Sequence, residues 1–267
     1  MVKHVIPLLV FLMAACALAR AEPPRSVFLE DLTWTEVRAA TQAGRTTIIV
    51  PVGGTEQNGP HMALGKHNAR ARILAGKIAE ALGNALVAPV VAYVPEGSTN
   101  PPTAHMRFPG TITIPEDAFE KVLESAARGF RLHGFKDIVF LGDHGGYRKG
   151  LARVAERLDR EWAGTSVRVH AIAAYYDSET SGFAALLRQK GFTEAQIGTH
   201  AGLADTALTL AVDPSLVRID RLGAATKGAA DGVSGDPRRA TAELGRLGAD
   251  LVVERTVDAI RKATARR

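Results

Sequence analysis

The sequence predicts an α/β protein with a mostly parallel central sheet and helices on both faces. Apolar runs typical of buried strands alternate with helical runs, which is the pattern of β-α-β units. The chain has 267 residues, 46% of them hydrophobic, and can therefore bury a large core without disulfide bonds. No internal repeat or linker-like stretch follows the N-terminal segment, so we expect one domain over residues 22–267.

Residues 1–21 resemble a secretory signal peptide. Lys3 precedes the apolar run "VIPLLVFLMAACALA", and small residues precede a cleavage position after Ala21. The run is short for a membrane span. We therefore predict export to the periplasm. The alternative is a lipoprotein anchored at Cys16, because "MAAC" loosely resembles a lipoprotein box, although Met13 stands where leucine is usual.

Composition excludes several classes of protein. The single cysteine lies in the predicted signal, so the mature chain has neither a thiol nucleophile nor a disulfide framework. Cleavage removes two of the 33 basic residues and leaves 31 against 28 acids. These bases are scattered among acids on helices, as in "RLDREW", which argues against a nucleic-acid-binding surface.

The first half of the domain contains two predicted strands around a helix. "TTIIVPV" (46–52) is an apolar run that predicts a buried strand. "NARARILAGKIAEALG" (68–83) has apolar residues at helical spacing and a glycine that can end the helix. "ALVAPVVAYV" (85–94) predicts a second strand, and a Pro/Gly-rich segment (95–115) follows it.

The second half repeats this alternation. We predict a helix from Glu116 to about His133, a strand at "DIVFLGD" (137–143), a helix over 147–163 and a strand at "VRVHAIAAYY" (167–176). A further helix is expected at "TALTLAV" (206–212).

Polar residues follow these strands at their carboxyl ends, where parallel sheets bind ligands. Glu56 follows the first strand and His144 the third, and other histidines and acids lie in loops nearby. Histidine and carboxylate ligands without thiolates suit zinc, manganese or iron(II). A serine triad is disfavoured because no G-x-S-x-G elbow is present. "GGYRKG" lacks the spacing of a phosphate-binding loop.

Several motifs together resemble the creatininase (creatinine amidohydrolase) family. "PVGGTEQNGPHMALGKH" is similar to its P-x-G-s-x-E-x-H-G-P-H-L-P-x-x-T-D motif, "GDHGGY" to N-G-H-G-G-N, "THAGLADTALTL" to H-A-G-E-x-E-T-S, and "HMRFPGTITI" contains its F-P-G-T segment. The resemblance implies a metal-dependent hydrolase of non-peptide C–N bonds with two adjacent divalent ions. It also implies a parallel-sheet α/β fold and a homo-oligomer, often a hexamer.

The ligands of the second ion are changed in this chain. The family histidine two residues after the motif glutamate is Asn58, and the aspartate that bridges both ions is His67. Two further positions that offer carboxylates in family members are Gly146 and Leu203. We therefore predict a single divalent ion, with zinc as the first choice and manganese or iron as alternatives.

Roles for the remaining polar residues follow from the same resemblance. The predicted metal ligands are Glu56, His67 and His144. His200 is a candidate proton shuttle, and Asp205 is expected to orient it or to act as a fourth ligand. Asp143 is expected to brace a ligand imidazole. The predicted substrate-binding residues are His61, His105, Arg107, Asn58 and Tyr147.

These residues predict a hydrolase of an amide, a cyclic amide or a formamide in a small molecule. The alternative is an inactive periplasmic protein of the same fold that binds a metal or a small molecule.

Overall fold

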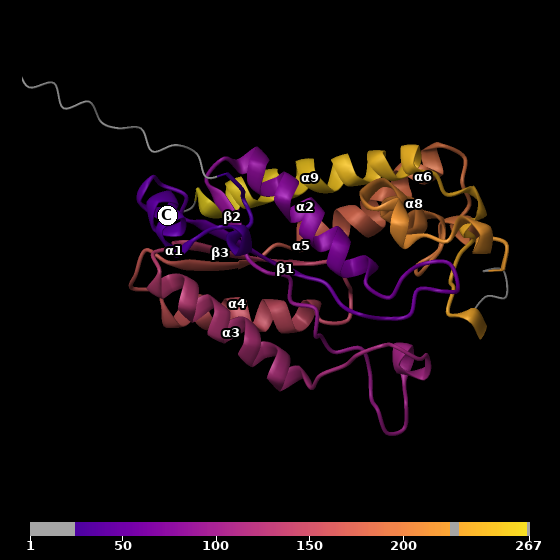
Figure 1. Cartoon of the computed structure of the whole chain (residues 1–267), viewed down its shortest axis with the longest axis horizontal. Coiled ribbons are helices and arrows are strands. Elements are labelled where there is room, and N and C mark those ends of the chain that lie inside the picture. Colours follow the sequence, from indigo (N-terminus) through magenta and orange to yellow (C-terminus); the bar gives the residue numbers. More distant parts are fainter. Residues whose placement is uncertain (1–24, 225–229, 266–267) are drawn as a thin grey trace, which may run out of the picture.

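The computed structural model describes residues 25–224 and 230–265, so the predicted signal peptide and Cys16 lie outside the described residues. Its central sheet has the strand order β2-β1-β3-β4, and every pair of neighbouring strands is parallel (Figure 1). The strands are β1 (Thr47–Val52), β2 (Ala85–Val87), β3 (Asp137–Gly142) and β4 (Arg168–Ala171). The predicted fold class is confirmed.

Helices pack against both faces of this sheet. The long ones are α1 (Trp34–Gln42), α2 (Lys66–Leu82), α3 (Glu116–Leu132), α4 (Arg148–Glu161), α8 (Leu203–Val212) and α9 (Ala242–Thr264). Shorter ones are α5 (Ala173–Asp177), α6 (Phe183–Gln189), α7 (Glu194–Ile197), the π-helical turn η3 (Ser178–Gly182) and the 3₁₀ turns η1 (Leu29–Asp31), η2 (Ala104–Arg107), η4 (Pro214–Leu216), η5 (Ile219–Arg221) and η7 (Pro237–Arg239).

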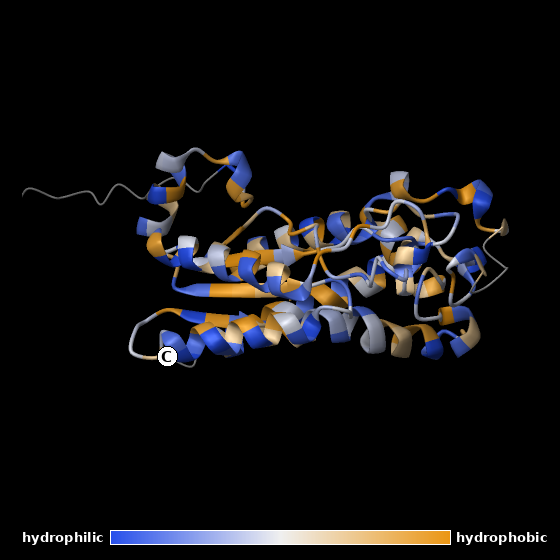
Figure 2. Ribbon diagram, turned by 90° about the horizontal axis from the view of Figure 1, so that it is seen from below, coloured by the Kyte–Doolittle hydropathy of each residue, from blue (hydrophilic) through white to orange (hydrophobic). Residues whose placement is uncertain are grey.

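The alternation of side chains along the strands divides the core into two layers. Ile48 and Val50 of β1 point toward α3 and α4, whereas Ile49 points toward α2, α8 and α9. Figure 2 shows polar and apolar residues alternating at short intervals along the helices, as expected for helices that bury one side. Among the described residues, no helix combines the length and apolar character that a membrane span requires.

Two predicted strands are shorter than expected. The run 85–94 pairs regularly only through Val87, because Pro89 has no backbone N–H to continue the ladder. The run 167–176 leaves the sheet after Ala171 and forms α5, in which Tyr175 is buried in the core. Apolar runs of this kind suit a buried helix as well as a buried strand.

Helix α2 begins at Lys66 rather than at residue 68, and it is capped at its C-terminal end by Gly83, which has a positive φ of 79°. The earlier start places Lys66, His67 and Arg70 in the first turns, where all three are buried. This start determines the electrostatics of the site described next.

Candidate metal centre and adjoining cavity

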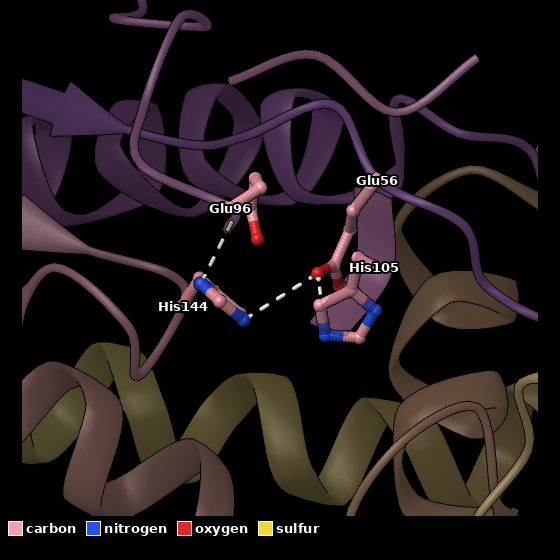
Figure 3. Close-up of side chains that lie close together, drawn as sticks. All are labelled: Glu56, Glu96, His105 and His144. Carbon is pink, nitrogen blue, oxygen red and sulfur yellow. Dashed lines mark ion pairs between the residues drawn. The ribbon is translucent and has the colours of Figure 1, made fainter. Parts of the chain in front are cut away.

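The candidate metal centre lies at the edge of the sheet where the strands end. Glu56 follows β1 and His144 follows β3, and the order of the strands reverses between these two neighbours. Open parallel sheets bind ligands at such a reversal. Glu96, after β2, and His105, in η2, complete a cluster of four side chains (Figure 3). One ligand atom from each lies within 4.8 Å of the others.

The contacts within this cluster leave carboxylate oxygens for an ion. Glu56 Oε2 is 3.2 Å from His105 Nε2 and 3.4 Å from His144 Nε2. His144 Nδ1 is 3.6 Å from Glu96 Oε1. Glu56 Oε2 and both Glu96 oxygens are buried without a hydrogen-bond partner among the described residues. Unpaired buried carboxylates are costly, and a bound cation would offset that cost. Two carboxylates and two imidazoles therefore fit zinc, manganese or iron(II).

The protonation of the cluster also suits an ion. Burial lowers the pKa of His144 to about 3 and also lowers that of His105, so both rings are neutral and have a lone pair. Burial, followed by the charge of Glu56, raises the pKa of Glu96 to about 8. The proton that this keeps on Glu96 at neutral pH is one that a divalent ion would displace.

His67 lies beside the cluster but is not part of it. Its Nε2 is 2.8 Å from Glu56 Oε1 and its Nδ1 is 2.6 Å from Asp143 Oδ1. Burial and the Lys66 ammonium act to lower the pKa of His67, but the two carboxylates outweigh them and raise it to about 9. An imidazolium has no lone pair for an ion. The His67 ring thus lies between Glu56 and Asp143 and outside the four-residue cluster, and its predicted role as a ligand stays a prediction.

A buried guanidinium, Arg70, joins three acids behind His67. Its nitrogens donate to Asp143 Oδ1 and Asp205 Oδ1, each at 2.6 Å, and to Glu179 Oε1. Asp205 Oδ2 is also paired with Lys66. Burial acts to raise the pKa of Asp205, but the two cations outweigh it and hold the pKa well below its usual range. Asp205 therefore pairs with the two cations and, among the described residues, makes no hydrogen bond to the His200 ring.

His200 faces the centre from the loop before α8. Its Nδ1 is 3.6 Å from Glu56 Oε1, and its Nε2 is 2.9 Å from the carbonyl oxygen of Gln57. Burial, followed by the Lys66 charge, lowers the pKa of His200 to about 4, so the ring is neutral at pH 7. If Nε2–H donates to the Gln57 carbonyl, Nδ1 is left as a proton acceptor.

Two residues predicted to bind substrate are buried in the loop after β1. His61 is 0% exposed, contacts Thr206 Oγ1 at 3.0 Å through Nε2, and has a pKa lowered by burial to about 4. Asn58 is also 0% exposed and donates through Nδ2 to the carbonyl oxygens of Glu56 and Ala63. Neither lines the cavity, so both support the loop that carries Glu56.

The other two predicted substrate-binding residues outside the cluster also differ from expectation. Arg107 is exposed in η2, and its side chain makes no hydrogen bond or ion pair with any described residue. Tyr147 is 1% exposed, and its hydroxyl donates to the carbonyl oxygens of Val52 and Gly53. It accepts from the backbone N–H groups of residues 143 and 144. Tyr147 therefore ties the loop after β3 to the end of β1.

Replacing Tyr147 by phenylalanine is expected to lower the free energy of unfolding by about 1–3 kcal/mol, because buried backbone groups lose their partner. Urea denaturation of the variant and the wild-type protein measures the difference. Unchanged stability together with a raised KM would instead support the prediction that Tyr147 contacts the substrate.

A cavity of about 500 Å³ adjoins the metal centre. Its volume is within the range of small-molecule sites. Its wall includes His105, His144 and His200, together with Lys66 and Glu179. Glu179 lies on the π-helical turn η3, a kind of distortion that is frequent at functional sites.

Sequence reasoning missed four residues of this site: Glu96, Lys66, Arg70 and Glu179. Glu96 could have been found, because it follows the second apolar run just as Glu56 follows the first. The two cations of α2 carry no such signal, since polar positions on a helix ordinarily face solvent.

One family model, Creatininase, described as creatinine amidohydrolase, matches residues 30–260. The chain belongs to the creatininase family. This confirms the resemblance of the motifs and the prediction of an enzyme of the amidohydrolase type. A creatinine amidohydrolase from Pseudomonas putida is 29% identical over 261 residues, which span 89% of this chain and 97% of that protein. A mycofactocin precursor peptide peptidase from Mycolicibacterium smegmatis is 29% identical over 231 residues, 77% of this chain and 81% of that protein.

Solved creatininase structures share this fold and contain metals. One described as the Mn form and a mutant described as of Zn-Zn type each have a TM-score of 0.73 and 26% identity, covering 90% of this chain and 99% of theirs. A divalent ion is thus part of creatininase chemistry, and the four-residue cluster provides a place for it here.

Two positions that the motif comparison singled out, Leu203 and Gly146, supply no ligand in this chain. Leu203 is 0% exposed and packs in the core between the sheet, α2 and α9. Gly146 has no side chain, and a Cβ added there would meet His144 Cε1 at 3.0 Å.

Proposed function

We propose that this chain hydrolyses a C–N bond of an amide, a cyclic amide or a formamide in a small molecule, using one divalent ion. The proposed ligands are Glu56, Glu96, His105 and His144. The observation that carries the proposal is a set of buried carboxyl oxygens that have no hydrogen-bond partner among the described residues, beside two neutral imidazoles at a cavity wall. We propose zinc, and the same ligands would accept manganese or iron(II).

A single ion is supported by the charge next to the cluster. His67 replaces the aspartate that bridges two ions in the creatininase motif, and its pKa of about 9 keeps it positive at neutral pH. A positive ring that donates to Glu56 opposes a second cation at that position.

The side chains suggest how the reaction would run. A bound divalent ion supplies Lewis acidity, which makes water a better nucleophile and polarises a carbonyl group. His67 donates to Glu56 Oε1 and leaves Oε2 directed at His105 and His144. The neutral His200 can accept a proton from the attacking water at Nδ1 and pass it to the leaving nitrogen.

The experiment that tests this function uses metal-free protein supplied with zinc, manganese or iron(II). A panel of amides, cyclic amides, formamides and short peptides is assayed for released amine; the peptides are included because one relative is a peptidase. Metal-dependent turnover that a chelator abolishes supports the proposal. A tightly bound ion with no product across the panel would favour the inactive binding protein.

Two histidine variants distinguish the ligand sets. His105→Gln is expected to release the ion, whereas His67→Gln should keep it with affinity reduced roughly 10–100-fold, the usual effect of losing a group that orients a ligand. Elemental analysis and zinc titration measure both. His133→Gln, at an exposed histidine after α3, is the control. Retention of the ion by His105→Gln and its loss from His67→Gln would restore the set predicted from sequence.

We also propose that the chain is exported and that cleavage follows Ala21, as the N-terminal sequence predicts. The intact mass of protein recovered from the periplasm is expected to match a chain that begins at Glu22. A lipidated N-terminus at Cys16 would contradict a soluble mature protein.

Self-association is a further proposal. A cavity of about 750 Å³ between α1 and α3 is bordered by Trp34 and Leu132, which are 72% and 80% exposed. Exposed apolar surface of this kind is common at protein interfaces. Light scattering gives the mass in solution, and a monomer would contradict the proposal.

A further inference from the structure

Lys66 occupies an unusual position for a lysine. It is the first residue of α2, its side chain is 1% exposed, and it lies in the wall of the cavity beside the metal centre. Among the described residues its ammonium group contacts one side chain, that of Asp205. An ammonium carries three N–H donors. Donors therefore remain for a ligand in the cavity.

Folding alone does not account for this placement. A buried lysine gives up its hydration, and an ion pair seldom repays that cost. The first turn of a helix also disfavours a cation, because the helix dipole is positive there. Asp205 has other partners, since it accepts from Arg70 Nη1 at 2.6 Å and from the backbone N–H of Ala201 at 2.8 Å. A costly charge in a cavity wall is typical of a functional site.

Lys66 lies in the same cavity wall as His105, His144 and His200. A ligand in that cavity is therefore near both the ammonium group and the rings that face the metal centre.

The motif comparison shows what this cation replaces. The creatininase motif ends in T-D, where the aspartate bridges two ions, and the matching residues here are Lys66 and His67. A neutral residue and an acid of the motif have thus become two basic residues in this chain.

We propose that the Lys66 ammonium binds the substrate oxygen that becomes negative when the carbonyl carbon is attacked. The bond is a charge-assisted N–H···O hydrogen bond. Its catalytic part rests on the proposed hydrolase function. The underlying property, a lysine that binds an anion in the cavity, does not depend on turnover.

Anion binding tests the inference directly, with inorganic phosphate as the probe. Calorimetry is carried out on the zinc-loaded and metal-free forms of wild type, Lys66→Met and Lys66→Arg. The loss of one charge-assisted bond should weaken phosphate binding about 10–100-fold in Lys66→Met, in both forms. Lys66→Arg should stay within about threefold of wild type. Lys77→Met, at an exposed lysine on the same helix, is the matched control and should bind phosphate as wild type does.

Further measurements separate this role from a structural one. Zinc content should be unchanged in Lys66→Met. With any amide that the enzyme turns over, kcat should fall roughly 10²–10³-fold with little change in KM, as for the loss of an oxyanion donor.

If Lys66→Met does not fold, the double variant Lys66→Met with Asp205→Asn removes both charges and takes its place in the binding experiment. Phosphate affinity equal to wild type in a folded, zinc-containing variant would overturn the inference, and so would absence of phosphate binding to the wild-type protein. Loss of phosphate binding in Lys66→Met without any detectable hydrolysis by wild type would support the anion site and reject the hydrolase proposal.

Discussion

Replacement of Glu56 by glutamine is expected to remove the metal ion and with it the activity. Glu56 Oε2 lies 3.2 Å from His105 Nε2 and 3.4 Å from His144 Nε2. An amide keeps the shape but loses the negative charge. Since the loss of a group that merely orients a ligand lowers affinity 10–100-fold, we expect a decrease of more than about 100-fold for Glu56→Gln.

Thermal denaturation with added zinc gives a second measure of the same change. An ion that binds only the folded state stabilises it by about 2.7 kcal/mol at 100 times its Kd, so zinc should raise the Tm of the wild-type protein. Glu56→Gln should show no such rise over that concentration range. Glu80→Gln, at an exposed acid on α2, is the control and should respond like wild type. A full complement of tightly bound zinc in Glu56→Gln would place the ion elsewhere.

Part of this site was predictable from the sequence, because the position of residues that follow parallel strands depends only on the order of the elements. Buried strands are recognisable from their apolar runs, and the residue after each run lies near the same edge of a parallel sheet. Glu56 and His144 were predicted in this way. Glu96 follows the same rule, but the segment from residue 88 to residue 115 has no regular pairing or periodicity that would show which of its residues turn inward.

Pairings between charged side chains were not predictable from the sequence. Asp205 and His200 are neighbours in one loop, so a contact between them was the simplest expectation. The structure instead pairs Asp205 with Lys66 and Arg70, on a helix that precedes it by more than 130 residues. Helical periodicity assigns such cations to the solvent side, and only the packing of α2 against α8 reveals that they are buried.

The contacts of His67 were not predictable from the sequence either. From the motif alone, an imidazole in place of a ligand carboxylate suggests a ligand, because neutral histidine binds metals well. Its actual state depends on two carboxylates, Glu56 and Asp143, one on each side of the ring. The second of them, Asp143, stands where the family motif has glycine next to the histidine, so its effect on His67 could be seen only in the fold.

The largest effect on stability is expected from Arg70→Met. Arg70 is 1% exposed and pairs with Asp143, Asp205 and Glu179. Methionine fills a similar volume but leaves these buried acids without their shared cation. Breaking a buried pair by removing one partner costs about 3–5 kcal/mol. For a chain of this size each kcal/mol lowers Tm by about 2–4 °C, so a decrease of roughly 6–20 °C is expected.

Arg72→Met is the matched control, two residues further along the same helix. Arg72 is 39% exposed and pairs with Glu30 at 3.2 Å, an arrangement whose loss costs less than about 1 kcal/mol.

The pH dependence of the unfolding free energy separates the effect of charge from the effect of packing. Paired Asp143 and Asp205 have lowered pKa values, so their pairing stabilises the wild type above an unfolded pKa of about 3.9 and is lost as the pH falls below it. The gap in unfolding free energy between wild type and Arg70→Met should therefore narrow below about pH 4. A gap no larger than that of Arg72→Met at pH 7 would mean that water or a cation already balances the three acids, and that the charge of α2 is not what holds this side of the metal centre together.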